Sequence, residues 1–176
     1  PVMSESEATG VVQKIVRYDA DPPQGPWRER ILLAADDICQ SNRPDQLGWM
    51  HVRQTEALSN GPVPQDANIL KLYMIEYGSQ CIYDRKPDAA RDLMTHLDDG
   101  VLWFNFTGHG SETQLADERL LETAALGSLA NGEKLFFFLT ASCAVGKYAH
   151  GGDGVGVAAV RLPHGGAVGV VSASGL

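Results

Sequence analysis

The chain has 176 residues and a mass of 18.9 kDa, which is the size of one ordinary domain. Hydrophobic residues make up 44% of the chain and charged residues 20%, a balance that excludes an intrinsically disordered protein. The net charge of −8 disfavours a nucleic-acid partner, because phosphate backbones are bound by Lys and Arg. The apolar run Leu135 to Leu139 is far shorter than the roughly 20 residues that span a bilayer.

The hydrophobic pattern predicts helices that alternate with strands along almost the whole chain. Ser4 and Glu7 form an S-x-x-E capping box at the start of a helix expected over Glu5–Tyr18. Short apolar runs predict buried strands at 30–35, 69–75, 101–106, 135–139 and 166–171. Further helices are expected at 48–58, 87–97, 121–129 and 154–162. This order predicts an α/β fold with a mostly parallel sheet and helices on both faces.

Reactive side chains follow several of the predicted strands. Asp36 and Asp37 come after the first strand, His109 after the third and Cys143 after the fourth. Ligands of open α/β sheets bind outside the carboxyl ends of the strands, so these residues are expected at one edge. Thiol catalysis needs such a set: an imidazole stabilises the thiolate, and a carboxylate fixes the imidazole tautomer. Each residue also has a purely structural interpretation, as a core thiol, a turn histidine or a helix cap.

Two segments resemble the gingipain-type family of cysteine peptidases. The turn Thr107-Gly108-His109-Gly110, followed by Ser111-Glu112, is similar to the turn that carries the family's histidine. Cys143, after Thr140-Ala141-Ser142 and 34 residues beyond His109, is similar to its cysteine. The stretch Ala116–Glu122 most closely resembles the family's sortase-like branch, typified by PorU of the type IX secretion system. Weaker similarity at 25–28, 34–37 and 165–168 extends the resemblance over most of the chain.

The resemblance implies a caspase-like three-layer sandwich and a His/Cys dyad. Cys143 would be the nucleophile, and His109 the general base or the ion-pair partner of the thiolate. The backbone N–H groups of Gly110 and Cys143 would form the oxyanion hole. Asp36 or Asp37 would orient His109, and the residues leave open which of the two does so.

Other implications concern the surroundings of the dyad. Glu112 would shape the histidine loop or an S1 pocket, or else be a solvated turn residue. We expect one domain over 1–176 that is a fragment of a longer protein, with an incomplete pocket for the P1 residue. The substrate would be a protein or peptide, and the parent protein would be secreted or lie at the bacterial cell surface. No cofactor is expected. Some relatives bind calcium, but no D-x-D-x-D-G loop is present here.

Three other functions remain open at this point. The first is a caspase-like domain that has lost activity and serves binding or scaffolding. The second is nucleotide binding by the glycine-rich stretch Gly151–Gly156, which matches neither common phosphate-binding motif. The third is a zinc enzyme using Cys143 with His109, His150 and His164, which lack a recognisable ligand spacing. His51 and His96 are interpreted as ordinary surface residues of helices.

Overall fold

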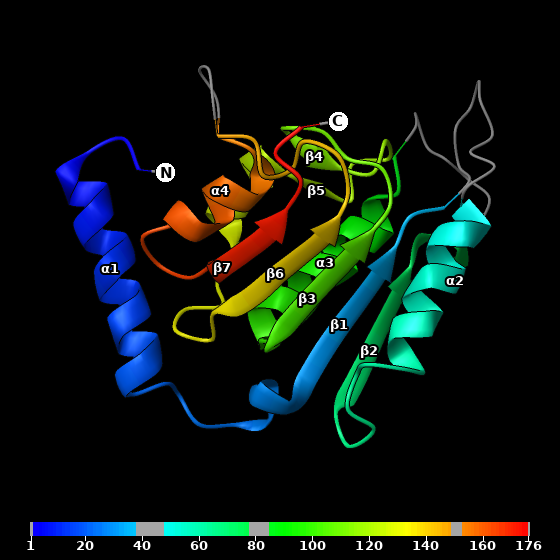
Figure 1. Cartoon of the computed structure of the whole chain (residues 1–176), viewed down its shortest axis with the longest axis horizontal. Helices are drawn as coiled ribbons and strands as arrows, with labels where there is room; N and C mark the ends of the chain where they lie inside the picture. Colours follow the sequence, from blue (N-terminus) through cyan, green and yellow to red (C-terminus); the bar gives the residue numbers. More distant parts are fainter. Residues whose placement is uncertain (1, 38–47, 78–84, 149–152, 176) are drawn as a thin grey trace.

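A five-stranded parallel sheet forms the centre of the chain (Figure 1). The computed structural model describes residues 2–37, 48–77, 85–148 and 153–175, so Cys39, Cys81 and His150 lie outside the described residues. The sheet has the order β2-β1-β3-β6-β7, and each neighbouring pair is parallel. Its strands are β1 (Arg30–Ala35), β2 (Asn68–Tyr73), β3 (Trp103–Thr107), β6 (Phe136–Ala141) and β7 (Ala167–Ser172). The α/β prediction is therefore confirmed.

Four α-helices lie close to the predicted positions. They are α1 (Glu5–Ala20), α2 (Gly48–Ser59), α3 (Pro87–Asp99) and α4 (Val155–Arg161). The capping box at the start of α1 is present, because Ser4 Oγ accepts the Glu7 N–H at 3.2 Å. Short 3₁₀ helices occur at η1 (Pro26–Glu29), η2 (Met74–Glu76) and η3 (Thr123–Ser128).

The helix predicted at 121–129 is present only in part, as the short 3₁₀ helix η3. The chain there forms β5 (Leu121–Glu122), which pairs antiparallel with β4 (Gln114–Leu115), and continues into η3. The reason lies in a contact from outside the segment: the Thr113 carbonyl accepts both the N–H of Thr123 at 2.9 Å and its hydroxyl at 3.3 Å. This tertiary pairing overrides the local helical preference of Leu and Ala.

One face of the sheet carries the main hydrophobic core, and helices α3 and α4 cover that face. The rings of Phe104 and Phe138 stack there with centroids 4.9 Å apart. Helix α2 packs against β1 on the opposite side, in front of the sheet in Figure 1, where α3 lies behind it. No helix among the described residues is long and apolar enough to cross a membrane.

Buried charges attach α1 to α4. The ammonium of Lys14 donates to the carbonyls of Val160 at 2.6 Å, Leu162 at 3.1 Å and Gly165 at 3.1 Å. Arg161 pairs with Glu7 of α1 and with Asp153. Lys14 thus satisfies two carbonyl groups at the end of α4, those of Val160 and Leu162, and one in the loop before β7.

Candidate active site

His109 and Cys143 lie at the ends of two neighbouring strands. Strands β3 and β6 pair Thr107 with Ala141, and each of the two candidate residues follows two positions beyond that pair. The Gly108 N–H still donates to the Ala141 carbonyl at 3.4 Å, so the two chains remain adjacent past the strands. Neighbouring strands are about 4.8 Å apart, which is close enough for an imidazole and a thiol to meet. Cys143 is exposed, and His109 is half-buried.

The turn that carries His109 is fixed to the end of β1 by Asp36. The buried carboxylate of Asp36 accepts the His109 N–H at 2.8 Å and the Asp37 N–H at 2.9 Å. Gly108 permits this approach, because a Cβ at that position would lie 2.2 Å from the Cβ of Asp36. Burial raises the pKa of Asp36 to about 6, although the two N–H donors and the charge of His109 act in the opposite direction.

The two aspartates considered for orienting His109 have different partners. Asp37 forms a buried ion pair with Lys86, whose ammonium also donates to the Met74 carbonyl at 2.6 Å. Glu118 lies in the same cluster, and burial, together with the charges of Asp36 and Asp37, raises its pKa to about 8. Asp36 is therefore the aspartate that contacts the backbone of the histidine turn.

Among the described residues, one group of three side chains could offer metal ligands close together. It consists of Asp36, Asp37 and Glu118, whose ligand atoms lie within 4.8 Å of one another. The ammonium of Lys86 already supplies positive charge to this group. The set proposed for zinc forms no such cluster within the described part of the chain, and its fourth member, His150, lies outside that part.

A small hairpin packs against the turn that carries His109. Gly110 forms an antiparallel bridge with Leu115, flanked by hydrogen bonds from the Ala116 N–H to the His109 carbonyl and from the Ser111 N–H to the Gln114 carbonyl, both 2.9 Å. This is the antiparallel pairing in which the bridged residues exchange no hydrogen bond. The hairpin therefore does not use the N–H of Gly110.

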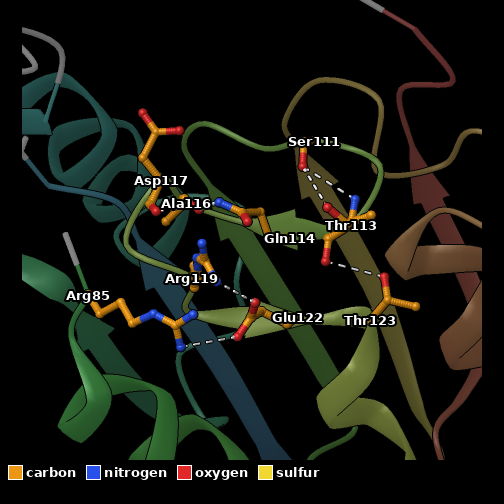
Figure 2. Close-up of polar contacts among 9 residues, drawn as sticks. All are labelled: Arg85, Ser111, Thr113, Gln114, Ala116, Asp117, Arg119, Glu122 and Thr123. Carbon is orange, nitrogen blue, oxygen red and sulfur yellow. Dashed lines mark hydrogen bonds and ion pairs between the residues drawn. The ribbon is translucent and has the colours of Figure 1, made fainter. Parts of the chain in front are cut away.

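Polar side chains hold this hairpin together (Figure 2). Glu122 accepts a hydrogen bond from Arg119 at 3.3 Å and pairs with Arg85 at 3.7 Å (Figure 2). Gln114 donates to the Ala116 carbonyl at 2.9 Å. Ala116 and Arg119 adopt left-handed backbone conformations, with φ of 59° and 60°. The segment Ala116–Glu122 thus supports the turn that carries His109.

The chain turns sharply at Cys143 and presents the thiol to solvent. Ala144 has a left-handed φ of 55°, and its N–H donates to the Gly175 carbonyl at 3.2 Å, beyond the end of β7. Ser142 is buried beneath Gly110, where a Cβ on Gly110 would lie 2.2 Å from the Ser142 Oγ. The histidine turn and the cysteine turn therefore pack directly against each other.

Glu112 connects the same two turns through charge. Its carboxylate pairs with Lys147, four residues after the cysteine, and its carbonyl accepts the Val155 N–H at the start of α4 at 2.9 Å. The side chain of Glu112 is 44% exposed and that of Lys147 35%, so the ion pair contributes at most about 1 kcal/mol to the stability of the fold. Of the roles considered for Glu112, shaping the loop agrees with these contacts.

His51 is the residue of this site that the sequence interpretation missed. It is 7% exposed rather than on the surface, and its ring lies edge-to-face with that of His109, with centroids 5.3 Å apart. The four buried residues of α2 are spaced as one helical face and are small or polar: Gly48, His51, Thr55 and Ser59. The helical spacing of these four residues could have indicated that His51 is buried. A search for periodic apolar residues does not detect it, because the four residues are small or polar.

A pocket of about 320 Å³ lies at the opposite edge of the sheet from the cysteine. It is lined by residues of α1, including Lys14 and Arg17, and by the segments before β6 and β7. The candidate catalytic groups therefore lie outside this pocket.

Comparisons with known proteins agree with this geometry. Residues 1–176 match the model of peptidase family C25. Lys-gingipain W83 of Porphyromonas gingivalis is 27% identical over 146 residues, covering 82% of this chain and 8% of its own length. A second Lys-gingipain of that organism is 24% identical over 172 residues, covering 97% of this chain and 9% of its own length.

The fold is also that of solved gingipain structures. The Arg-specific cysteine proteinase gingipain R superposes with a TM-score of 0.74 at 17% identity, covering 97% of this chain and 38% of its own. A complex of gingipain pro- and mature domains from Porphyromonas gingivalis gives a TM-score of 0.70 at 16% identity, covering 98% and 39%. The chain thus spans under a tenth of the curated relatives and about two fifths of the solved chains. The match over its whole length shows that the chain belongs to peptidase family C25.

Proposed function

We propose that this chain is a peptidase domain, within a longer protein, in which Cys143 is the nucleophile and His109 the base of a cysteine endopeptidase. One observation carries the proposal: both residues follow the Thr107–Ala141 pair by two positions, at adjacent carboxyl ends of the sheet. The membership of family C25 and the cysteine proteinase named among the structural neighbours support the class of reaction.

The geometry supports a mechanism through a thioester. The imidazole of His109 takes the proton of the Cys143 thiol, and the thiolate attacks the carbonyl carbon of the peptide bond. The N–H groups of Gly110 and Cys143 donate hydrogen bonds to the developing oxyanion. The hairpin does not use the N–H of Gly110. Protonated His109 then donates its proton to the leaving amine. Asp36 stabilises the imidazolium through its charge and holds the turn through the backbone N–H.

The second half of the reaction decides between two outcomes. Water that attacks the thioester, with His109 accepting its proton, completes hydrolysis, whereas an amine in the same position completes transpeptidation. In both cases the C–S bond breaks, and the Cys143 sulfur leaves and recovers its proton from His109. The hairpin at Ala116–Glu122 motivates the second outcome, sortase-like processing of exported proteins by a secreted or cell-surface parent. A peptide panel with Lys or Arg before the cleaved bond, the residues in the names of the relatives, is the appropriate first screen. Adding an amine nucleophile separates the two products by mass.

Intact-mass labelling with limiting iodoacetamide tests the dyad itself, because the thiolate is the reactive form. We expect Cys143 to react faster than the other two thiols, and His109→Ala to slow it by about 10²-fold near pH 7. The exposed His164, in the loop before β7, provides a matched control, and His164→Ala is expected to leave the rate unchanged. If His109→Ala reacts as fast as the unmodified protein, the proposed dyad is wrong, and a binding or scaffolding domain becomes the better interpretation.

A further inference from the structure

His51 contacts the candidate base from the opposite side of the sheet to α3. It lies in the first turn of α2, and the Thr55 hydroxyl donates to its carbonyl at 2.9 Å one turn later. Its ring is buried and meets the ring of His109 at an interplanar angle of 85°. Edge-to-face contact at a centroid distance of 5.3 Å is a preferred packing geometry of aromatic rings.

The two residues next to His109 in the sequence are glycines, which have no side chain to pack against its ring. Gly108 and Gly110 flank it, and both are required as glycine by the close approach of Asp36 and Ser142. The hydrogen bond from the His109 N–H to Asp36 fixes the backbone of the turn, and the contact with His51 acts on the ring itself. An imidazole that serves as a base must hold one orientation toward the thiol, and packing against a buried ring helps to hold it.

We propose that His51 is a positioning residue, which orients the imidazole of His109 toward Cys143 through this edge-to-face contact. The inference rests on the proposed function and adds a residue to it. It requires His51 to be neutral while the dyad works, because a second imidazolium at 5.3 Å would oppose the positive charge that forms on His109. The other charged groups around this edge are Asp36 and Asp37 after β1, with Lys86 and Glu118 in the same buried cluster.

The test measures the rate of Cys143 alkylation between about pH 5 and pH 9, where histidine titrates. His51→Ala removes the ring, and His51→Phe keeps a ring that cannot be protonated. The control is Gln54→Ala, an exposed position on the same helix. At about pH 8 we expect His51→Ala to be slower by roughly 10-fold or more, and His51→Phe to stay within about 3-fold of the unmodified protein.

Rescue by a ring distinguishes positioning from a merely structural role. His51→Phe keeps a ring at the contact with His109, so it should recover most of the alkylation rate that His51→Ala loses. The inference is overturned if His51→Ala matches the unmodified protein at every pH, or if His51→Phe is as slow as His51→Ala. In that case the proposed dyad still stands if His109→Ala slows the alkylation of Cys143. If His109→Ala leaves the alkylation rate unchanged, the proposed function is refuted as well. Circular dichroism identifies a variant that does not fold, and the His51→Phe profile then decides.

Discussion

Replacing Glu118 by Gln should stabilise the protein, and the gain should grow with pH. Glu118 is buried between Asp36 and Asp37, so its ionised form is penalised both by burial and by like charge. Its pKa is about 8 in the folded chain, against 4.5 for an ordinary glutamate. The folded state therefore holds an extra proton between these two values, and stability falls as pH rises through this window. Gln keeps the size of the side chain without its charge.

The size of the effect follows from the two pKa values. One pKa unit corresponds to about 1.4 kcal/mol, so keeping Glu118 protonated costs the folded state about 1 kcal/mol at pH 5 and about 3 kcal/mol at pH 7. The advantage of Glu118→Gln over the natural chain should therefore increase by about 2 kcal/mol between these two pH values. Taking the difference between the two chains cancels the titration of groups that they share.

Urea unfolding followed by tryptophan fluorescence at several pH values measures this difference. Glu133, an exposed residue before β6, provides the matched control, because Glu133→Gln makes the same chemical change without burial. Its effect should stay within about 0.5 kcal/mol at every pH. A constant advantage of Glu118→Gln from pH 5 to pH 7 would refute the reasoning, since it would mean that Glu118 ionises normally in the folded chain.

Three further predictions concern the turns and α1. Gly110→Ala should destabilise the fold by about 1–3 kcal/mol in urea unfolding, because its Cβ meets the Ser142 Oγ, and Ser142→Ala in the same chain should restore part of the loss. Asp36→Ala removes the acceptor of two backbone N–H groups and should slow alkylation of Cys143 by about 10-fold or more; an unchanged rate would contradict its role in holding the turn. Burial lowers the pKa of Lys14 from 10.5 to about 8, so stability should rise with pH through that window, and Lys14→Met should abolish the rise.

The parallel sheet could be predicted because its strands appear as continuous apolar runs. This holds even for β6, in which buried and exposed residues alternate. The order of strands and helices then places the ends of β3 and β6 at one edge, and this is why the amino-acid pattern makes His109 and Cys143 candidates, whose roles the family resemblance implies. The S-x-x-E box at Ser4 was equally informative, because its hydrogen bond joins residues three positions apart.

Features that depend on distant partners could not be predicted. The hairpin of β4 and β5 forms because Thr113 bonds Thr123, a contact that no local propensity contains. The division of work between Asp36 and Asp37 depends on Lys86, which lies far along the chain in the turn before α3. His51 escaped notice because a histidine on a predicted helix is normally exposed, and its burial depends on how α2 packs against β1.

The position of the two reactive residues on neighbouring strands has a consequence for folding. β3 and β6 are neighbours in the sheet but are separated in the chain by the hairpin and η3, so the imidazole and the thiol come together only when these two strands pair. The alkylation rate of Cys143 should therefore report whether β3 and β6 have paired. Brief pulses of alkylating reagent during refolding would show when β3 and β6 pair, without any added label.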